Sequence, residues 1–145
     1  MKSFMLPYSW KFPGLFLTFS GLLLAILYIW FDFRFTLPVF AVFSSFMETK
    51  MFETFTTNFA DELIMILFVC GFGFIVFSKE KVEYQNLNYV RYKAIAKAAV
   101  ANNIFLLFSI LFVYGSGFIA VLVLNLFSFS VFYLLIFYLL KKKEV

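Results

Sequence analysis

The amino-acid sequence predicts an all-α fold: one integral membrane domain, residues 1–145, that forms a bundle of four transmembrane helices with an extracytoplasmic amphipathic helix between spans 1 and 2. Three observations predict this fold. Of the 145 residues, 64% are hydrophobic and 14% are charged, whereas a soluble domain is about half apolar and a quarter charged. The apolar residues form runs long enough to cross a bilayer, which takes roughly 17–25 helical residues. Most Lys and Arg residues lie in the segments that flank these runs.

The first predicted span covers residues 13–31. Pro13 suits the first turn of a helix, where its missing N–H costs nothing. Trp10 and Trp30 bracket the run. At about 1.5 Å per residue they lie roughly 30 Å apart, which is the thickness of the hydrocarbon core. Aromatic rings at both edges of an apolar run are typical of a helix that crosses a membrane.

The loop that follows, residues 36–57, has an amphipathic pattern. Apolar side chains recur at every fourth position, and Ser, Thr, Glu and Lys fill much of the rest. This spacing predicts a helix with one apolar face. We expect it to lie in the outer membrane–water interface or to cap the bundle; a lid over a substrate is the alternative. The apolar positions are Phe43, Met47, Met51, Phe55 and Phe59.

The second predicted span covers residues 58–77. Its uncharged part, residues 63–77, is only about 22 Å long as a helix, so the helix must begin earlier. Asp61 and Glu62 then fall in its first turn, where acidic side chains favour the positive end of the helix dipole. Gly71 and Gly73 allow another helix to approach closely, although they are not spaced as GxxxG.

The third and fourth predicted spans, residues 98–114 and 118–140, form a helical hairpin. A single helix over this stretch would be about 64 Å long, about twice the thickness of the hydrocarbon core. The Gly-Ser-Gly segment at 115–117 is a turn signal. The chain is therefore expected to fold back here.

The distribution of positive charge predicts the orientation. Ten of the 12 Lys and Arg residues lie before span 1, between spans 2 and 3, or after span 4, and with four spans these segments share one side. Positively charged segments stay in the cytoplasm, so both chain ends are predicted to be cytoplasmic. We expect contact with anionic lipid head groups on that side, and no binding of nucleic acid. The ten are Lys2, Lys11, Lys79, Lys81, Arg91, Lys93, Lys97, Lys141, Lys142 and Lys143.

Polar side chains inside the third and fourth spans are the first functional candidates, because polar groups in hydrocarbon need partners. A hairpin centred on Ser116 places Asn102 level with Ser130, and Ser109 within one turn of Asn125. We expect hydrogen bonds between the two helices that fix their register; a polar path or a ligand pocket is the alternative. The candidates are Asn102, Asn103, Ser109, Asn125, Ser128 and Ser130.

The connector between spans 2 and 3 begins "FSKEKVEYQNLNYVRYK" and is the most charged stretch of the chain. Its Tyr and Arg residues are of the types enriched in the energetically dominant parts of interfaces. They predict a surface that binds a protein partner; a solvated loop held to lipid by its basic residues is the alternative. The candidate contacts are Lys79, Lys81, Tyr89, Arg91 and Lys93.

The sequence contains no pattern of residues that indicates catalysis. There is no His, which is the commonest general base and metal ligand. Cys70, the only Cys, lies in an apolar run. Asp61 and Glu62 are adjacent, so their side chains diverge on a helix. We therefore expect no catalytic, cofactor or metal site.

One resemblance involves residues 77–140. The motifs are "FSKEK" at 77–81, Glu83, Arg91, Asn103, "LFVYG" at 111–115 and "NLF" at 125–127. With them, the segment resembles a family of small four-span membrane proteins of Bacteroidota. Unlike that family, this chain has few acidic residues after "KEK". The resemblance implies four spans and a bacterial inner membrane, and it implies no activity, because none is established for the family.

These observations favour a non-enzymatic membrane protein, an accessory or regulatory subunit that docks a partner through its basic connector. A self-assembled pore lined by the polar residues of spans 3 and 4 is the first alternative. A membrane enzyme that acts on lipid is the second, and the amphipathic loop alone supports it.

Overall fold

The computed structural model of the chain describes residues 5–44 and 50–144. Within them, four helices are long and apolar enough to cross a membrane, which confirms the prediction of a largely helical chain with four candidate spans. The elements in chain order are η1 (Tyr8–Trp10), α1 (Lys11–Phe31), β1 (Thr36–Ser44), β2 (Lys50–Asn58), α2 (Ala60–Phe77), α3 (Leu87–Phe112) and α4 (Ser116–Glu144).

The helix α3 begins well before the predicted span at residue 98, because the second half of the connector is also helical. Leu87, Val90, Ala94 and Ala98 recur at intervals of three or four residues, and all four are fully buried. This spacing places them on one side of a helix, where they pack against α4. The basic residues of this stretch therefore extend a candidate membrane-spanning helix rather than form a loop.

The segment between α1 and α2 is a β-hairpin, and the prediction of an amphipathic helix there is wrong. β1 and β2 pair antiparallel, with Val39 opposite Phe55 and Phe40 opposite Thr54. Apolar residues four apart share a face of a helix, but four is also a multiple of two, so they share a face of a strand as well. Met47, part of the predicted pattern, lies outside the described residues.

The composition of the hairpin explains why strands form instead of a helix. β1 is rich in Val and Phe and β2 in Thr and Phe, and these residue types favour extended structure. Pro38 would be tolerated only near the start of a helix, whereas it fits a strand that lies at a sheet edge. At the base of the hairpin, the side-chain oxygen of Asn58 accepts hydrogen bonds from the backbone N–H groups of Phe35 and Ala60, at 3.2 and 3.3 Å.

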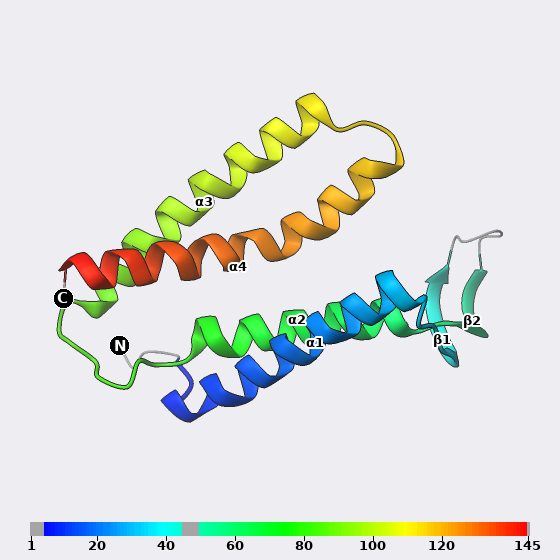
Figure 1. The fold of residues 1–145 in the computed structure, drawn as a ribbon, viewed down its shortest axis with the longest axis horizontal. Coiled ribbons are helices and arrows are strands. Elements are labelled where there is room, and N and C mark those ends of the chain that lie inside the picture. The colour runs from blue at the N-terminus through cyan, green and yellow to red at the C-terminus, as the bar shows by residue number, and fades with distance from the viewer. Residues whose placement is uncertain (1–4, 45–49, 145) are drawn as a thin grey trace.

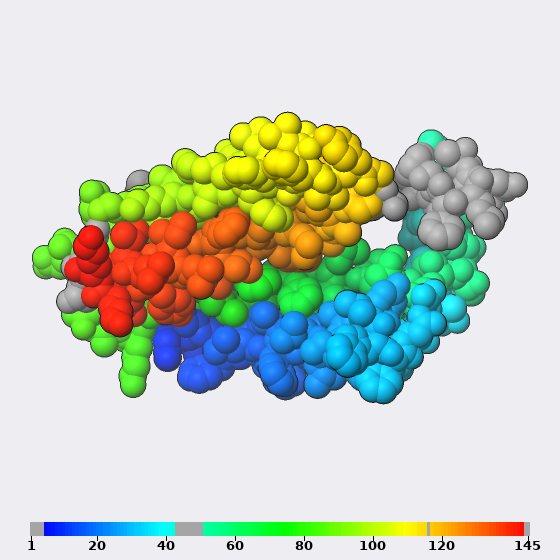
Figure 2. Space-filling view, turned by 45° about the horizontal axis from the view of Figure 1, so that its top comes forward, coloured from blue at the N-terminus to red at the C-terminus, as the bar shows by residue number. Residues whose placement is uncertain are grey.

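The four helices form two antiparallel pairs that lie one against the other (Figure 1). The hairpin of strands joins α1 to α2, a short turn joins α3 to α4, and α2 contacts α4 between the pairs. The start of α1, the connector at 78–86 and the end of α4 gather at one end of the molecule, and the strands lie at the other. In the space-filling view, α4 lies between α3 and α2, and α1 lies on the opposite side of α2 (Figure 2).

The backbones of α1 and α2 approach closely at Gly14 and Gly71. A Cβ added to Gly71 would lie 2.8 Å from the backbone nitrogen of Thr18 and 3.1 Å from the carbonyl oxygen of Gly14. Gly21 lies in a second close contact, where an added Cβ would be 3.2 Å from the Leu67 side chain. Gly14 and Thr18 form a small-xxx-small pattern, which allows membrane helices to pack backbone to backbone. This pattern faces the Gly71 that the sequence singled out.

The α3–α4 pair is held by side chains instead. Its buried core combines small aliphatic residues of α3 with aromatic residues of α4, and the Tyr133 and Phe137 rings are stacked with centroids 5.8 Å apart. Because Ala94 and Ala98 are small, the large rings of α4 fit against α3. The core residues are Leu87, Val90, Ala94, Ala98, Tyr133, Phe137 and Leu140.

Candidate functional site

The start of the connector at residues 78–86 is hydrogen-bonded to the segment before α1 and to the last turn of α2. The N–H of Leu6 donates to the carbonyl of Phe77, and the N–H of Lys79 donates to the carbonyl of Leu6, each at 2.9 Å. Ser78 is buried, and its hydroxyl donates to the carbonyl of Ile75 at 3.1 Å. The segment before α1 therefore pairs with the connector directly after α2 ends.

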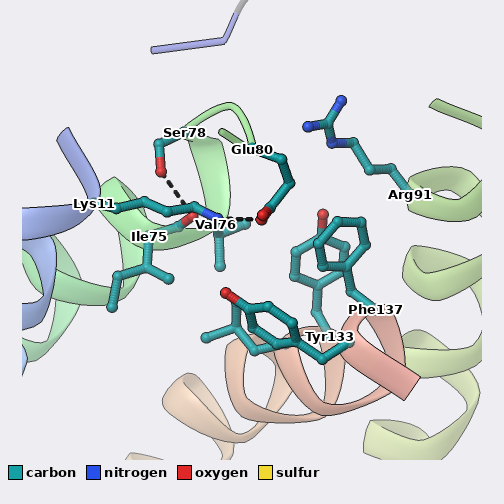
Figure 3. Close-up of a pocket in the computed structure, with 10 residues that line it drawn as sticks. Lys11, Ile75, Val76, Ser78, Glu80, Arg91, Tyr133 and Phe137 are labelled. Carbon is teal, nitrogen blue, oxygen red and sulfur yellow. Dashed lines mark hydrogen bonds and ion pairs between the residues drawn. The ribbon is translucent and has the colours of Figure 1, made fainter. Parts of the chain in front are cut away.

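The Glu80 carboxylate lies between lysines from two different helices. Lys11 of α1 donates to one oxygen, and Lys141 of α4 donates to the other at 2.7 Å. The Glu80 side chain is only 9% exposed. Figure 3 shows Lys11 reaching across to the carboxylate beside α4. We call Lys11, Glu80 and Lys141 the Glu80 clasp, because one carboxylate joins the first helix, the connector and the last helix.

The protonation of Glu80 reflects this environment. Burial alone would raise the pKa of its carboxyl, but the hydrogen bonds and positive charges of Lys11 and Lys141 lower the pKa below its usual 4.5. Glu80 is therefore ionised at neutral pH, and the clasp is a pair of charge-assisted hydrogen bonds.

Arg91, which is buried, forms a second ion pair at the same end with Glu83, whose side chain is 37% exposed. Its two terminal nitrogens donate to the two oxygens of Glu83, at 3.0 and 2.6 Å, and one of them also donates to Asn88 at 3.0 Å. Hydrogen bonds from Arg91 lower the pKa of Glu83. The guanidinium carbon lies 5.9 Å from the centre of the Phe137 ring. Arg91 is only 7% exposed, so this predicted partner contact is directed into the protein.

Both acidic residues of the connector are thus used in internal ion pairs, and the outward charge is positive. The predicted contacts Lys79, Lys81 and Tyr89 are exposed, and the ammonium of Lys93 lies 5.6 Å from the centre of the Tyr89 ring. We define the cationic surface as the exposed lysines at this end of the helices. They are Lys79, Lys81, Lys97, Lys142 and Lys143.

A cavity of about 10 Å³ lies beside the clasp, lined among others by Glu80, Arg91 and Tyr133 (Figure 3). A volume of this size accommodates about one water molecule. It is too small for a substrate or an organic cofactor. Among the described residues, no group of three or more His, Cys, Asp or Glu side chains could hold a metal ion.

The polar residues of α3 and α4 meet, but not in the expected register. The Asn102 side-chain oxygen accepts hydrogen bonds from Asn125, at 3.4 Å, and from the Ser128 hydroxyl. Asn102 therefore pairs with Ser128 rather than Ser130. The buried Ser109 hydroxyl donates within its own helix, to the carbonyl of residue 105 at 2.8 Å, and not to Asn125.

Asn103 and Ser130 stand apart from this cluster. The structure gives neither side chain a hydrogen bond to another described residue, and Asn103 is exposed on the side of α3 away from α4. Sequence reasoning grouped all six polar residues together. The structure brings Asn102, Asn125 and Ser128 together and leaves the other three outside that group.

Sequence reasoning also missed the Glu80 clasp. One signal was available, because Glu80 and Glu83 are acids inside the most basic stretch of the chain. Acidic residues in such a stretch are candidates for internal ion pairs. Their partners, however, lie as far as 69 residues away in the sequence.

Comparison of the chain with known protein families, curated proteins and solved structures finds no match.

Proposed function

We propose that the chain is a non-enzymatic, multi-pass protein of the bacterial inner membrane that binds an acidic partner protein through its cationic surface, as an accessory or regulatory subunit. The observation that carries this proposal is that both connector acids are bound in ion pairs within the chain. Glu80 and Glu83 are held in internal ion pairs, so the lysines around them are not neutralised by their nearest acids. Such a surface attracts a partner of opposite charge and speeds its association.

Exposed aromatic residues beside the lysines support a protein partner in addition to lipid. Tyr84, Tyr89 and Tyr92 are all exposed. Tyr supplies a rigid apolar ring with a polar tip and is enriched among the residues that dominate binding energy. Lysines alone would suffice for anionic head groups. The combination favours a protein that approaches along the membrane surface.

The charge distribution supports a cytoplasmic position for this surface. Both ends of the described chain and the connector lie at the same end of the molecule (Figure 1), and the segments there hold most of its Lys and Arg residues. Positive segments stay on the cytoplasmic side. The β-hairpin would then face outward.

Charge reversal at the cationic surface tests the proposal. The tagged full chain, carrying Lys79→Glu and Lys81→Glu, is purified in mild detergent, and co-purifying proteins are compared with those of the unaltered chain. Loss of a specific acidic partner at low salt is expected. Arg34→Glu is the control, because it reverses an exposed charge at the opposite end. A partner that both variants retain equally would refute the proposal.

An oligomeric pore has weaker support. The side chains of Asn102, Asn125 and Ser128 bond to one another within a single chain, so they do not project into a shared path. Conductance of vesicles that contain the purified protein would revive this alternative.

A further inference from the structure

The outward side of α3 carries a side-chain amide that no described part of the chain covers. Four Asn residues lie in the candidate spans. Asn88 accepts from Arg91, and Asn102 and Asn125 bond to each other. Asn103 has no such partner among the described residues and is exposed in the apolar part of α3.

An unpaired amide in hydrocarbon is costly. Transfer of an amide out of water without a new hydrogen bond costs on the order of 2–7 kcal/mol. Polar residues in membrane helices therefore almost always face other helices. Asn103 follows Asn102, and successive residues are about 100° apart around a helix, so the two amides cannot both face α4. Asn102 is the one that bonds to α4, and Asn103 is left without a partner in the described chain.

The residues around Asn103 form a continuous strip along α3. They follow one another at intervals of four, three, four and three residues, an average of 3.5, which is the spacing of the contact line between two paired helices. All five are exposed. We call this strip the α3 seam. Its residues are Ala96, Val100, Asn103, Leu107 and Ile110.

From this arrangement we infer that two copies of the chain associate through the α3 seam, with the Asn103 amides of the two copies hydrogen-bonded to each other. The inference does not rest on the function proposed above. An amide carries both a donor and an acceptor, so two identical amides related by a twofold axis satisfy one another. Two copies inserted in the same orientation present parallel α3 helices, which brings equivalent residues opposite each other. One polar residue in such a seam fixes the register and the number of helices.

The shape of α3 suits a neighbouring helix. An open hollow of about 370 Å³ lies to one side of the α3 seam, lined by Ala96 and Val100 of the seam and by Lys97, Ala101 and Ile104 of the neighbouring face. The small side chain of Ala96 allows close approach at the start of the seam. Lys97 lies at the basic end of the helix, where its ammonium can reach the water at the membrane surface.

Disulfide cross-linking in membranes tests the inference. Cys70 is replaced by Ser in every sample, so that each variant has a single Cys. Leu107→Cys places a thiol in the seam, and Phe108→Cys places one beside it on the same helix. The two positions are 61% and 59% exposed, so they are equally accessible to oxidant. Oxidation is expected to yield a dimer of twice the chain mass for Leu107→Cys, at least several times more than for Phe108→Cys.

The role of Asn103 is tested in the same background. Asn103→Leu keeps the size and removes the amide, and it is expected to weaken dimerisation roughly 3–30-fold, since one or two such hydrogen bonds contribute about 0.6–2 kcal/mol. Asn103→Gln keeps the amide and is expected to retain most cross-linking. Because this side chain faces away from α4, thermal unfolding of the monomer in detergent should not change.

Three results would overturn the inference. Equal cross-linking at positions 107 and 108 would mean that the chains meet by random collision in the membrane and not through the α3 seam. Unchanged dimerisation of Asn103→Leu would show that the Asn103 amide does not take part in the contact between the two copies. A cross-linked product with a mass other than twice that of the chain would show that a different protein covers the α3 seam. The partner-binding experiment at the cationic surface is unaffected by any of these results.

Discussion

In the α1–α2 pair two backbones meet directly, whereas in the α3–α4 pair side chains fill the space between the helices. Gly14 and Gly71 bring the first two helices into contact with no room for a Cβ. The second pair instead uses alanines against aromatic rings and an amide cluster around Asn102. Lipid tails are as apolar as the helices, so packing and hydrogen bonds must hold membrane helices together. The α1–α2 pair is held by backbone packing, and the α3–α4 pair by side-chain packing and hydrogen bonds.

The Glu80 clasp differs from both, because it is a pair of ion pairs that joins the two helix pairs to each other. Lys11 belongs to the first pair and Lys141 to the second, and Glu80 lies between them. Few contacts other than those of α2 with α4 connect the pairs. The comparison therefore predicts that substitutions in one pair leave the other intact, while loss of the clasp affects how the pairs are held together.

The largest expected effect is at Gly71. Gly71→Leu would place a large side chain against the backbone of α1, and overpacking of this kind costs about 1–3 kcal/mol or more. Gly73→Leu is the control, because a Cβ at Gly73 has no neighbour within 4 Å. Thermal unfolding in mild detergent should show a large loss for the first variant and little for the second. Equal losses would contradict the close α1–α2 contact.

A smaller effect is expected at Glu80. Glu80→Ala leaves two mostly buried lysines without their shared carboxylate, and removal of one partner of a buried ion pair costs up to about 3–5 kcal/mol. We expect about 2 kcal/mol, because Lys141 is partly exposed and can turn to water. The SDS concentration needed for unfolding measures this loss. An unchanged SDS unfolding curve would mean that the clasp does not stabilise the contact between the two helix pairs.

Asn102→Leu should cost less, about 1 kcal/mol, because hydrogen bonds between membrane helices contribute about 0.6–2 kcal/mol. It removes the acceptor of both Asn125 and Ser128. Asn103→Leu is the matched control at the next position, where no intramolecular hydrogen bond is lost. The unfolding of the monomer in detergent should distinguish them, and a larger loss for Asn103→Leu would reverse the assignment of the two faces of α3.

The smallest effect concerns pH. The pKa of Glu80 is lowered in the folded protein, so its contribution to stability is complete above pH 4.5 and is lost as the pH falls through the folded pKa. We expect the unfolding temperature of the unaltered chain to approach that of Glu80→Gln at low pH and to exceed it near pH 7. A constant difference between pH 3 and 7 would contradict the ionised clasp.

The sequence predicted the parts of the fold that depend on local composition. The apolar runs predicted four helices, and the positions of the lysines predicted that the basic segments lie together at one end of the bundle. Both predictions succeeded because length, hydropathy and charge are properties of a segment. The β-hairpin was missed because a spacing of four fits a helix and a strand equally well. Thr, Val and Phe favour strands only weakly on their own, and the pairing of β1 with β2 adds to that preference.

The candidate site was predicted in part. The surface lysines Lys79 and Lys81 were identified, but the inward direction of Arg91 was not. Arg91 has its partners Glu83 and Asn88 nearby in the sequence, and their arrangement depends on how the connector folds back onto α3. The contacts of Glu80 with Lys11 and Lys141 join segments far apart in the chain, and no pattern along the sequence places such residues together.

The accessibility of single cysteines in intact bacterial cells would show whether the four helices cross the membrane with the cationic surface in the cytoplasm. With Cys70 replaced by Ser, Phe52→Cys marks the β-hairpin and Lys81→Cys marks the cationic surface, and both positions are exposed. A maleimide that cannot cross membranes should label position 52 in intact cells, and position 81 only after the membrane is permeabilised. Labelling of position 81 in intact cells would contradict a four-span protein whose cationic surface faces the cytoplasm.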